Sequence, residues 1–210
     1  MGRSIAAAWI LIAGATAFAP AVARATGPDA DWPCVQRKVP TLSAGMMWGG
    51  PPVTDDLPDW RKDKAVSELV DRLAIRRTSL EEATGLVDSF AEGLEAEEKA
   101  EKLTMVFAGL LERSNLERSD ILDGIERYTR KQRQLAEKVL TTRHELDAIL
   151  AIEKPTEAED EKRRALEEAL NWQTRIHEDR EKSLTYICEI PVLLEQRLFQ
   201  LARELSNRIE

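Results

Sequence analysis

Apolar residues recur with a helical period over most of this chain. The first stripe has the spacing i, i+3, i+4, i+7 and consists of Val66, Leu69, Val70 and Leu73. It predicts a helix over residues 62–77. Ser79 and Glu82 have the spacing of a capping box, so a second short helix is expected to begin there. Gly93 is expected to end it.

A third helix is expected to begin near residue 95, and it carries the most apolar patch of the chain. The patch consists of Leu103, Val106, Phe107, Leu110 and Leu111. Ser114 and Glu117 repeat the Ser-x-x-Glu spacing, which predicts a bend or a helix restart within residues 113–120.

Two heptad runs follow, separated by a break. The first run is Ile121, Ile125, Tyr128, Gln132, Leu135, Val139, Thr142, Leu146 and Ile149. Pro155 interrupts it, because proline cannot continue a helix and disfavours helical geometry for the residue before it. The second run is Leu166, Ala169, Gln173, Ile176, Arg180, Ser183, Ile187, Ile190, Leu194, Leu198, Leu201 and Leu205. Steps of three and four residues are typical of coiled coils.

A fold-back at Pro155 would make residues whose numbers sum to about 312 face each other. Leucine then meets leucine at 146 and 166, and the polar positions also coincide, with Gln132 facing Arg180 and Tyr128 facing Ser183. This agreement favours an antiparallel hairpin over residues 119–189, with its tip near 153–157 and a reach of about 50 Å. A parallel dimer through one arm of the hairpin is the alternative.

Beyond the hairpin, the same register brings the C-terminal leucines beside the apolar patch of the third helix. Residues 62–118 and 190–210 are therefore expected to form a four-helix head at the base of the hairpin. Pro191 is expected to kink the last helix where the hairpin meets this head. The predicted fold class is all-α: a small helical bundle head, a long antiparallel coiled-coil hairpin and an extended N-terminal arm.

The arm, residues 26–61, departs from the helical pattern. It holds Pro28, Pro33, Pro40, Pro51, Pro52 and Pro58, six of the nine prolines. This density predicts an extended, irregular segment. Its large apolar side chains, Trp32, Met46, Met47 and Trp48, have two readings. If these side chains are buried, they act as apolar plugs that hold the arm on the head. If they are exposed, they form a surface for docking a partner.

Residues 1–25 have the pattern of a secretory signal peptide. Arg3 precedes an uncharged apolar stretch, and Ala23 and Ala25 give a small-x-small cleavage site. This predicts export, most simply to a bacterial periplasm; a membrane attachment would follow only if the segment were retained. In an exported protein the two cysteines, Cys34 and Cys188, are expected to form a disulfide, with free thiols or intermolecular pairing as the alternatives.

The net charge and the placement of histidines and acidic residues argue against several classes of function. Loss of two arginines with the leader would move the formal net charge from −8 to −10, which argues against binding nucleic acid or anionic lipid. The only histidines, His144 and His177, fall out of register in the hairpin, so they are not expected to share a metal. The acidic runs at 95–101 and 156–164 lack the ligand spacing of a calcium loop and suit the first turns of helices.

No catalytic residues, metal ligands or cofactor are therefore predicted. We expect a non-catalytic exported scaffold or adaptor, monomeric or homodimeric, that binds a protein partner. A chaperone-like accessory factor for an exported client is the first alternative, and a metal carrier or an enzyme that uses the acidic helix faces is the second.

Overall fold

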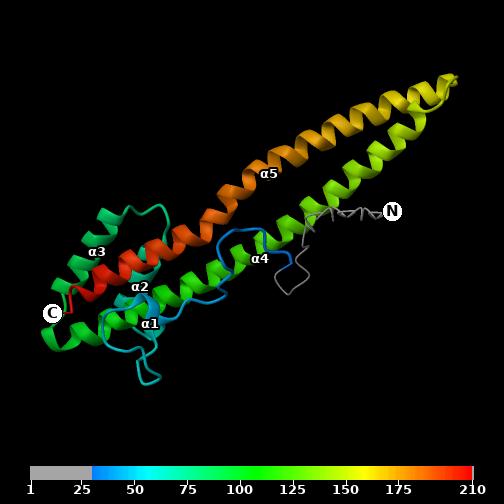
Figure 1. Cartoon of the computed structure of the whole chain (residues 1–210). Helices are drawn as coiled ribbons and strands as arrows, with labels where there is room; N and C mark the ends of the chain where they lie inside the picture. Colours follow the sequence, from blue (N-terminus) through cyan, green and yellow to red (C-terminus); the bar gives the residue numbers. More distant parts are fainter. Residues whose placement is uncertain (1–29, 210) are drawn as a thin grey trace, which may run out of the picture.

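The computed structural model describes residues 30–209, and this part of the chain is helical and without strands (Figure 1). The predicted all-α class is confirmed. The helical elements are α1 (Ala44–Met47), η1 (Trp60–Lys62), α2 (Lys64–Ala74), α3 (Leu80–Glu92), α4 (Ala96–Leu150) and α5 (Glu157–Ser206). The predicted signal peptide, residues 1–25, lies outside the described residues.

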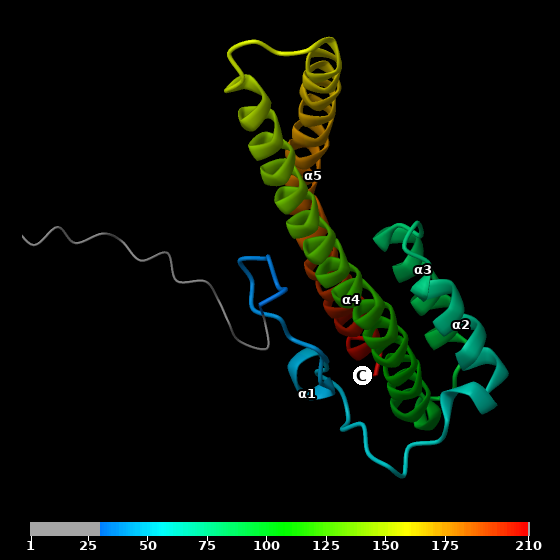
Figure 2. The same ribbon diagram turned by 90° about the vertical axis from the view of Figure 1, so that its right-hand side faces the viewer.

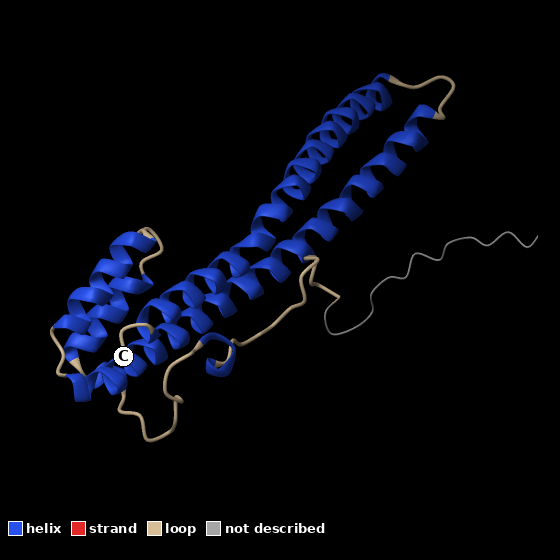
Figure 3. Cartoon of the chain, turned by 60° about the vertical axis from the view of Figure 1, so that its left-hand side comes forward, coloured by secondary structure: helices blue, strands red, loops and turns tan. Residues whose placement is uncertain are grey.

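Helices α4 and α5 form a long antiparallel hairpin, which we call the stalk where it extends beyond the other helices (Figures 1 and 3). The hairpin turns at residues 151–156, as Pro155 predicted. Thr156 then starts α5 with a complete capping box: its hydroxyl accepts the Glu159 backbone N–H, and the Glu159 carboxylate accepts the Thr156 N–H. Glu157, Glu159 and Asp160 form the acidic first turn that the sequence predicted.

Three polar contacts define the register of the stalk. The Thr142 hydroxyl donates to the side-chain oxygen of Gln173 at 3.0 Å, inside the stalk. The Gln132 amide donates to the His177 carbonyl at 2.7 Å, and the Tyr128 hydroxyl donates to the Arg180 carbonyl at 2.7 Å. Each pair lies within about one helical turn of the predicted register.

Two of the predicted interior positions of α5 were wrong. The side chains of Arg180 and Ser183 are exposed, although the heptad placed both in the interior. A guanidinium is costly to bury without a partner, and only the backbone carbonyl of Arg180 faces α4, where it binds Tyr128. The Ser183 hydroxyl donates to the carbonyl of Asp179 within its own helix.

The predicted bend or restart at residues 113–120 is also wrong, because α4 is continuous from Ala96 to Leu150. Three side chains of this stretch have partners elsewhere or pack inward. Asn115 binds the backbone of Leu42, Glu117 pairs with Arg76 at 3.2 Å, and Arg118 is buried. A break here would disrupt these contacts, so tertiary packing outweighs the local capping signal.

Around the base of α4 and α5, the remaining helices build the head. Helix α2 packs on α4 and helix α3 on α5, on the side of the pair opposite to α1 (Figure 2). The core joins residues from all four long elements, including Val66, Val70, Leu73, Val87, Phe107, Leu110, Leu198, Leu201 and Leu205. Ser79 caps α3 and Gly93 ends it, as predicted. Pro191 lies buried inside α5, which continues through it.

The N-terminal arm runs along α4 in the opposite direction, from the stalk toward the head (Figure 3). It is mostly extended, but residues 44–47 form one helical turn that the proline-based prediction missed. The ten residues between Pro40 and Pro51 contain no proline, so a single turn is sterically allowed there. None of the helices within residues 30–209 is long and apolar enough to span a membrane.

Candidate protein-binding surfaces

A disulfide joins the arm to α5 at the level where the stalk meets the head. The sulfurs of Cys34 and Cys188 are 2.02 Å apart, and their Cα atoms are 5.5 Å apart. Two hydrogen bonds surround the bridge. The Gln36 amide donates to the Cys188 carbonyl, and the indole of Trp32 donates to the Gln36 carbonyl at 2.7 Å. The predicted intramolecular pairing of the two cysteines is confirmed.

Polar contacts continue along the arm in both directions from the disulfide. Asp31 forms ion pairs with Arg130, at 2.7 Å, and with Arg133 on the stalk. On the head side, the Leu42 backbone N–H donates to the Asn115 side chain at 2.8 Å, and the Asn115 amide donates back to the Leu42 carbonyl at 3.0 Å. The two Asn115 bonds satisfy the N–H and the carbonyl of Leu42, which have no neighbouring strand to pair with.

Arg118 is the least exposed charged residue among those described, at 4%. Its guanidinium donates to the Val39 carbonyl of the arm and lies 3.7 Å from the carboxylate of Glu195 on α5. It therefore connects the arm, α4 and α5 at one point. A signal for it is present in the sequence, because Arg118 occupies an apolar-spaced position between Leu111 and Leu122.

Of the four apolar arm residues singled out from the sequence, three are buried or half-buried and one is exposed. Trp48 is half-buried and stacks on Phe107 of α4 with ring centroids 4.4 Å apart. Met47 is buried and Trp32 half-buried. Met46 does not act as a plug, because 61% of its surface is exposed. Burial of Met47 and stacking of Trp48 leave Met46 on the outer side of the single α1 turn.

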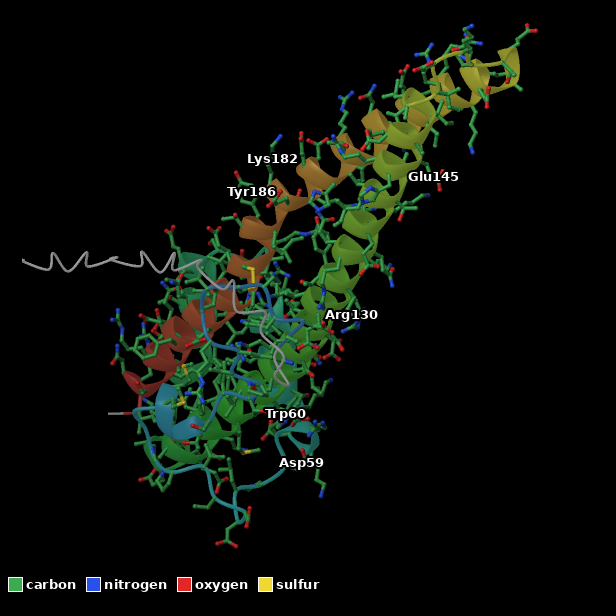
Figure 4. The ribbon with its side chains drawn as sticks, turned by 45° about the vertical axis from the view of Figure 1, so that its right-hand side comes forward. Asp59, Trp60, Arg130, Glu145, Lys182 and Tyr186 are labelled. Carbon is green, nitrogen blue, oxygen red and sulfur yellow. A yellow bond between two sulfur atoms is a disulfide. The ribbon has the colours of Figure 1, made fainter. Side chains whose placement is uncertain are left out.

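Trp60 is a further apolar contact that the sequence analysis did not single out. It is buried, and its indole donates to the Glu112 carboxylate at 3.2 Å. Gly109 permits the approach, since a Cβ added there would lie 2.9 Å from the Trp60 ring. Figure 4 shows Trp60 in the head, beside α4. The arm is thus attached to the stalk at its N-terminal end, through Asp31, and to the head at its C-terminal end, through Trp60.

Met46 borders a groove of about 510 Å³ between the arm and α5. Its apolar walls come from Val39, Met46 and Met47 on the arm and from Val192 and Phe199 on α5. Gln36, Arg37, Glu195 and Gln196 supply its polar atoms. Phe199 is 49% exposed, so the groove opens directly onto the outer face of α5.

A second hollow, of about 440 Å³, lies between α2, α4 and α5 over leucines of the head core. Each of its arginines already has an ion-pair or hydrogen-bond partner. Arg76 pairs with Glu117, Arg113 pairs with Asp71 at 3.0 Å, and Arg197 donates to the Leu73 and Ile75 carbonyls at 3.3 and 3.2 Å. Burial lowers the pKa of Arg197. These pairings hold α2 against the hairpin, and the carboxylate of Asp120 also lines the hollow.

The distal stalk carries large apolar side chains that face solvent. They are Leu140 (57% exposed), Leu150 (57%), Ile152 (37%) and Trp172 (64%). The described arm contacts end at Arg133, so this part of the stalk is held by α4 and α5 alone. We call these four residues the distal apolar set.

The titratable side chains do not gather into a site. His144 is exposed on α4 and His177 is half-buried on α5. Within residues 30–209, no three histidine, cysteine or acidic side chains lie close enough together to hold a metal ion. Hydrogen bonds from Thr156 lower the pKa of Glu159, which serves the α5 cap. Glu97 and Glu98 similarly occupy the first turn of α4.

Comparison with known proteins gives no match to a family model, a curated protein or a solved structure.

Proposed function

We propose that this protein is a non-catalytic, exported scaffold or adaptor that binds a protein partner through the distal stalk. The observation that carries the proposal is the exposed Trp172, with the rest of the distal apolar set around the end of the stalk. Tryptophan is the residue type most enriched among energetic hot spots of protein interfaces. A stalk held together by its own two helices presents such residues away from the head without a need for further support.

The internal bonding of the stalk supports a rigid spacer. The Thr142–Gln173 hydrogen bond and the Gln132 and Tyr128 contacts to α5 carbonyls keep the two helices in one register. A buried polar layer is a known way to select one register of a coiled coil. A rigid stalk lowers the entropic cost of binding, because the contact residues are already placed.

Export is supported by the leader pattern together with the disulfide. Disulfides persist in oxidising compartments such as the periplasm and are rare in the cytosol. The Cys34–Cys188 bridge holds the arm on α5. A structural role for the bridge is compatible with an adaptor.

The test is affinity capture from envelope extract with purified protein as bait, comparing Trp172→Ala with Tyr186→Ala. Both side chains are exposed aromatics on α5, at 64% and 73%, but Tyr186 lies on the proximal stalk beside Lys182 (Figure 4). We expect Trp172→Ala to lose a stoichiometric partner and Tyr186→Ala to retain it. Matching circular dichroism of the two variants controls for folding.

Equal capture by both variants and by the wild type would contradict binding at the distal stalk. A weak, heterogeneous set of captured proteins, unchanged by Trp172→Ala, would instead support the chaperone-like alternative.

A further inference from the structure

The outer face of α5 in the head carries no charge over three helical turns. Its exposed residues between 190 and 202 are Leu193, Gln196, Phe199 and Gln200. The chain as a whole is 32% charged, and the five consecutive residues 178–182 of the same helix are all exposed and all charged. A helix face turned to solvent normally concentrates charge, so this uncharged stretch requires an explanation.

These uncharged residues, with one charged residue at each end, form a seam with coiled-coil spacing. Going along α5, positions 189, 192 or 193, 196, 199 or 200, and 203 alternate steps of three and four. This seam lies opposite the buried seam of Leu194, Leu198, Leu201 and Leu205. The arm and its groove flank it on one side, and Arg197 and Arg208, which bind α2 and α3, flank it on the other. Within the described residues, nothing covers it.

The seam has one charged residue at each end, and the two charges have opposite sign. Glu189 stands at the stalk end and Arg203 at the C-terminal end, about 21 Å apart along the helix axis. Both are exposed, and neither has an ion-pair partner within residues 30–209. Gln196 lies midway between them. The seam is therefore self-complementary when it is turned end over end.

We infer that a second copy of this chain binds this seam, with the two α5 helices antiparallel and Gln196 on the two-fold axis. Leu193 of one copy then packs on Phe199 of the other, and Glu189 of one copy pairs with Arg203 of the other. The two glutamine amides can bond each other across the axis. An isologous contact of this kind closes into a dimer and does not propagate.

The charges select against the other helix orientation. In a parallel pair, Glu189 would face Glu189 and Arg203 would face Arg203, so both ends of the seam would repel. In the antiparallel pair both ends attract. Like-charge contacts at the flanks of a helix seam are the usual determinant of helix orientation and partner choice.

This dimer does not depend on the proposed function, but it has a consequence for it. The stalks of the two copies would point in opposite directions from the shared heads. From the axis at Gln196 to the start of α5 at Glu157 is about 58 Å, so the two tips would be separated by about 120 Å. The assembly would present two distal apolar sets at the ends of one rod.

The first experiment compares Leu193→Glu and Phe199→Glu with Leu140→Glu by sedimentation equilibrium of the purified protein. Leu193 and Leu140 are matched, at 58% and 57% exposure, and only Leu193 belongs to the seam. We expect a dimer for the wild type and for Leu140→Glu. The seam variants should dissociate about tenfold or more readily, because each introduces an unpaired buried carboxylate. A monomeric wild type, or equal dissociation of Leu193→Glu and Leu140→Glu, would overturn the inference.

The second experiment tests the orientation by charge exchange. Glu189→Arg alone and Arg203→Glu alone should each weaken the dimer, because each places like charges together in the antiparallel pair. The double variant should restore the wild-type dissociation constant, because the pairs form again with exchanged signs. In a parallel pair neither single exchange would add repulsion, so unweakened single variants would refute the antiparallel seam.

Discussion

At the scale of single residues, Asp63 shows how one carboxylate joins two elements. Its side chain accepts the Val66 backbone N–H at 3.0 Å and so caps α2. It also forms an ion pair with Lys102 of α4. The hydrogen bond from Lys102 is the main cause that lowers the pKa of Asp63 below its ordinary value of 3.8. The start of α2 is thereby fixed to α4 as well as capped.

Asp63→Asn should reveal the ion pair through its pH dependence. Asparagine keeps the cap but not the charge, so near neutral pH we expect a loss of about 0.5–1 kcal/mol in unfolding free energy. The folded-state pKa of Asp63 is lowered, so its contribution is complete above the unfolded value and disappears as pH falls through the folded value. Urea unfolding of both proteins across the acid range measures the difference. A difference that does not change with pH would contradict the ion pair.

At the scale of elements, the arm depends on one covalent and several non-covalent contacts. The disulfide joins positions 154 residues apart in the sequence. The Leu42–Asn115 hydrogen bonds and the Trp48–Phe107 stack hold the part of the arm nearer the head. The arm therefore has two separately attached halves, and only the half near the stalk depends on the disulfide.

Replacing both cysteines, Cys34→Ser with Cys188→Ser, should separate these halves. Closing so long a loop stabilises a fold by up to about 5 kcal/mol in the chain-entropy model, and measured losses are commonly about 2–5 kcal/mol. We expect a lower melting temperature and faster proteolysis within residues 30–40, but not within 42–48. Wild-type protein treated with a reductant should behave in the same way, and the double variant should not respond to it. Unchanged proteolysis of residues 30–40 would show that the disulfide does not hold the arm.

At the scale of the whole molecule, the long hairpin determines an elongated shape (Figure 1). Helix α4 alone has 55 residues, which corresponds to a length of about 80 Å. A compact domain of this chain length would have a radius of gyration of only about 17 Å. The long stalk contributes little to the core, because it buries only the interface between two helices. In the head, four helices pack around one core.

Small-angle scattering tests this shape directly. The Leu193→Glu variant is the suitable sample, because it removes the inferred dimer and isolates the monomer. We expect a maximum dimension of at least about 80 Å and a radius of gyration well above the compact value of about 17 Å. A profile that matches the compact value would be incompatible with an extended stalk.

Much of the stalk and head could be predicted because their signals are local or periodic. The Ser79 cap, the Gly93 stop and the fold-back at Pro155 each depend on a few neighbouring residues. The apolar seams repeat over many turns, so one exposed position such as Arg180 does not change the predicted hairpin. The error at residues 113–120 arose because a local signal competed with long-range contacts. Ser114 and Glu117 have capping spacing, yet Arg118 beside them is buried against the arm.

The sequence by itself determined the all-α class, the hairpin and its approximate register, because helix periodicity and proline geometry act over short distances along the chain. Only the tertiary structure decided how the arm lies, which of its side chains are buried, and which face of α5 stays open. Those outcomes depend on partners that are distant in sequence and that no pattern predicted: Asn115 for Leu42 and Phe107 for Trp48. An irregular segment has no period from which its facing residues could be counted, so its position follows from the surface on which it packs.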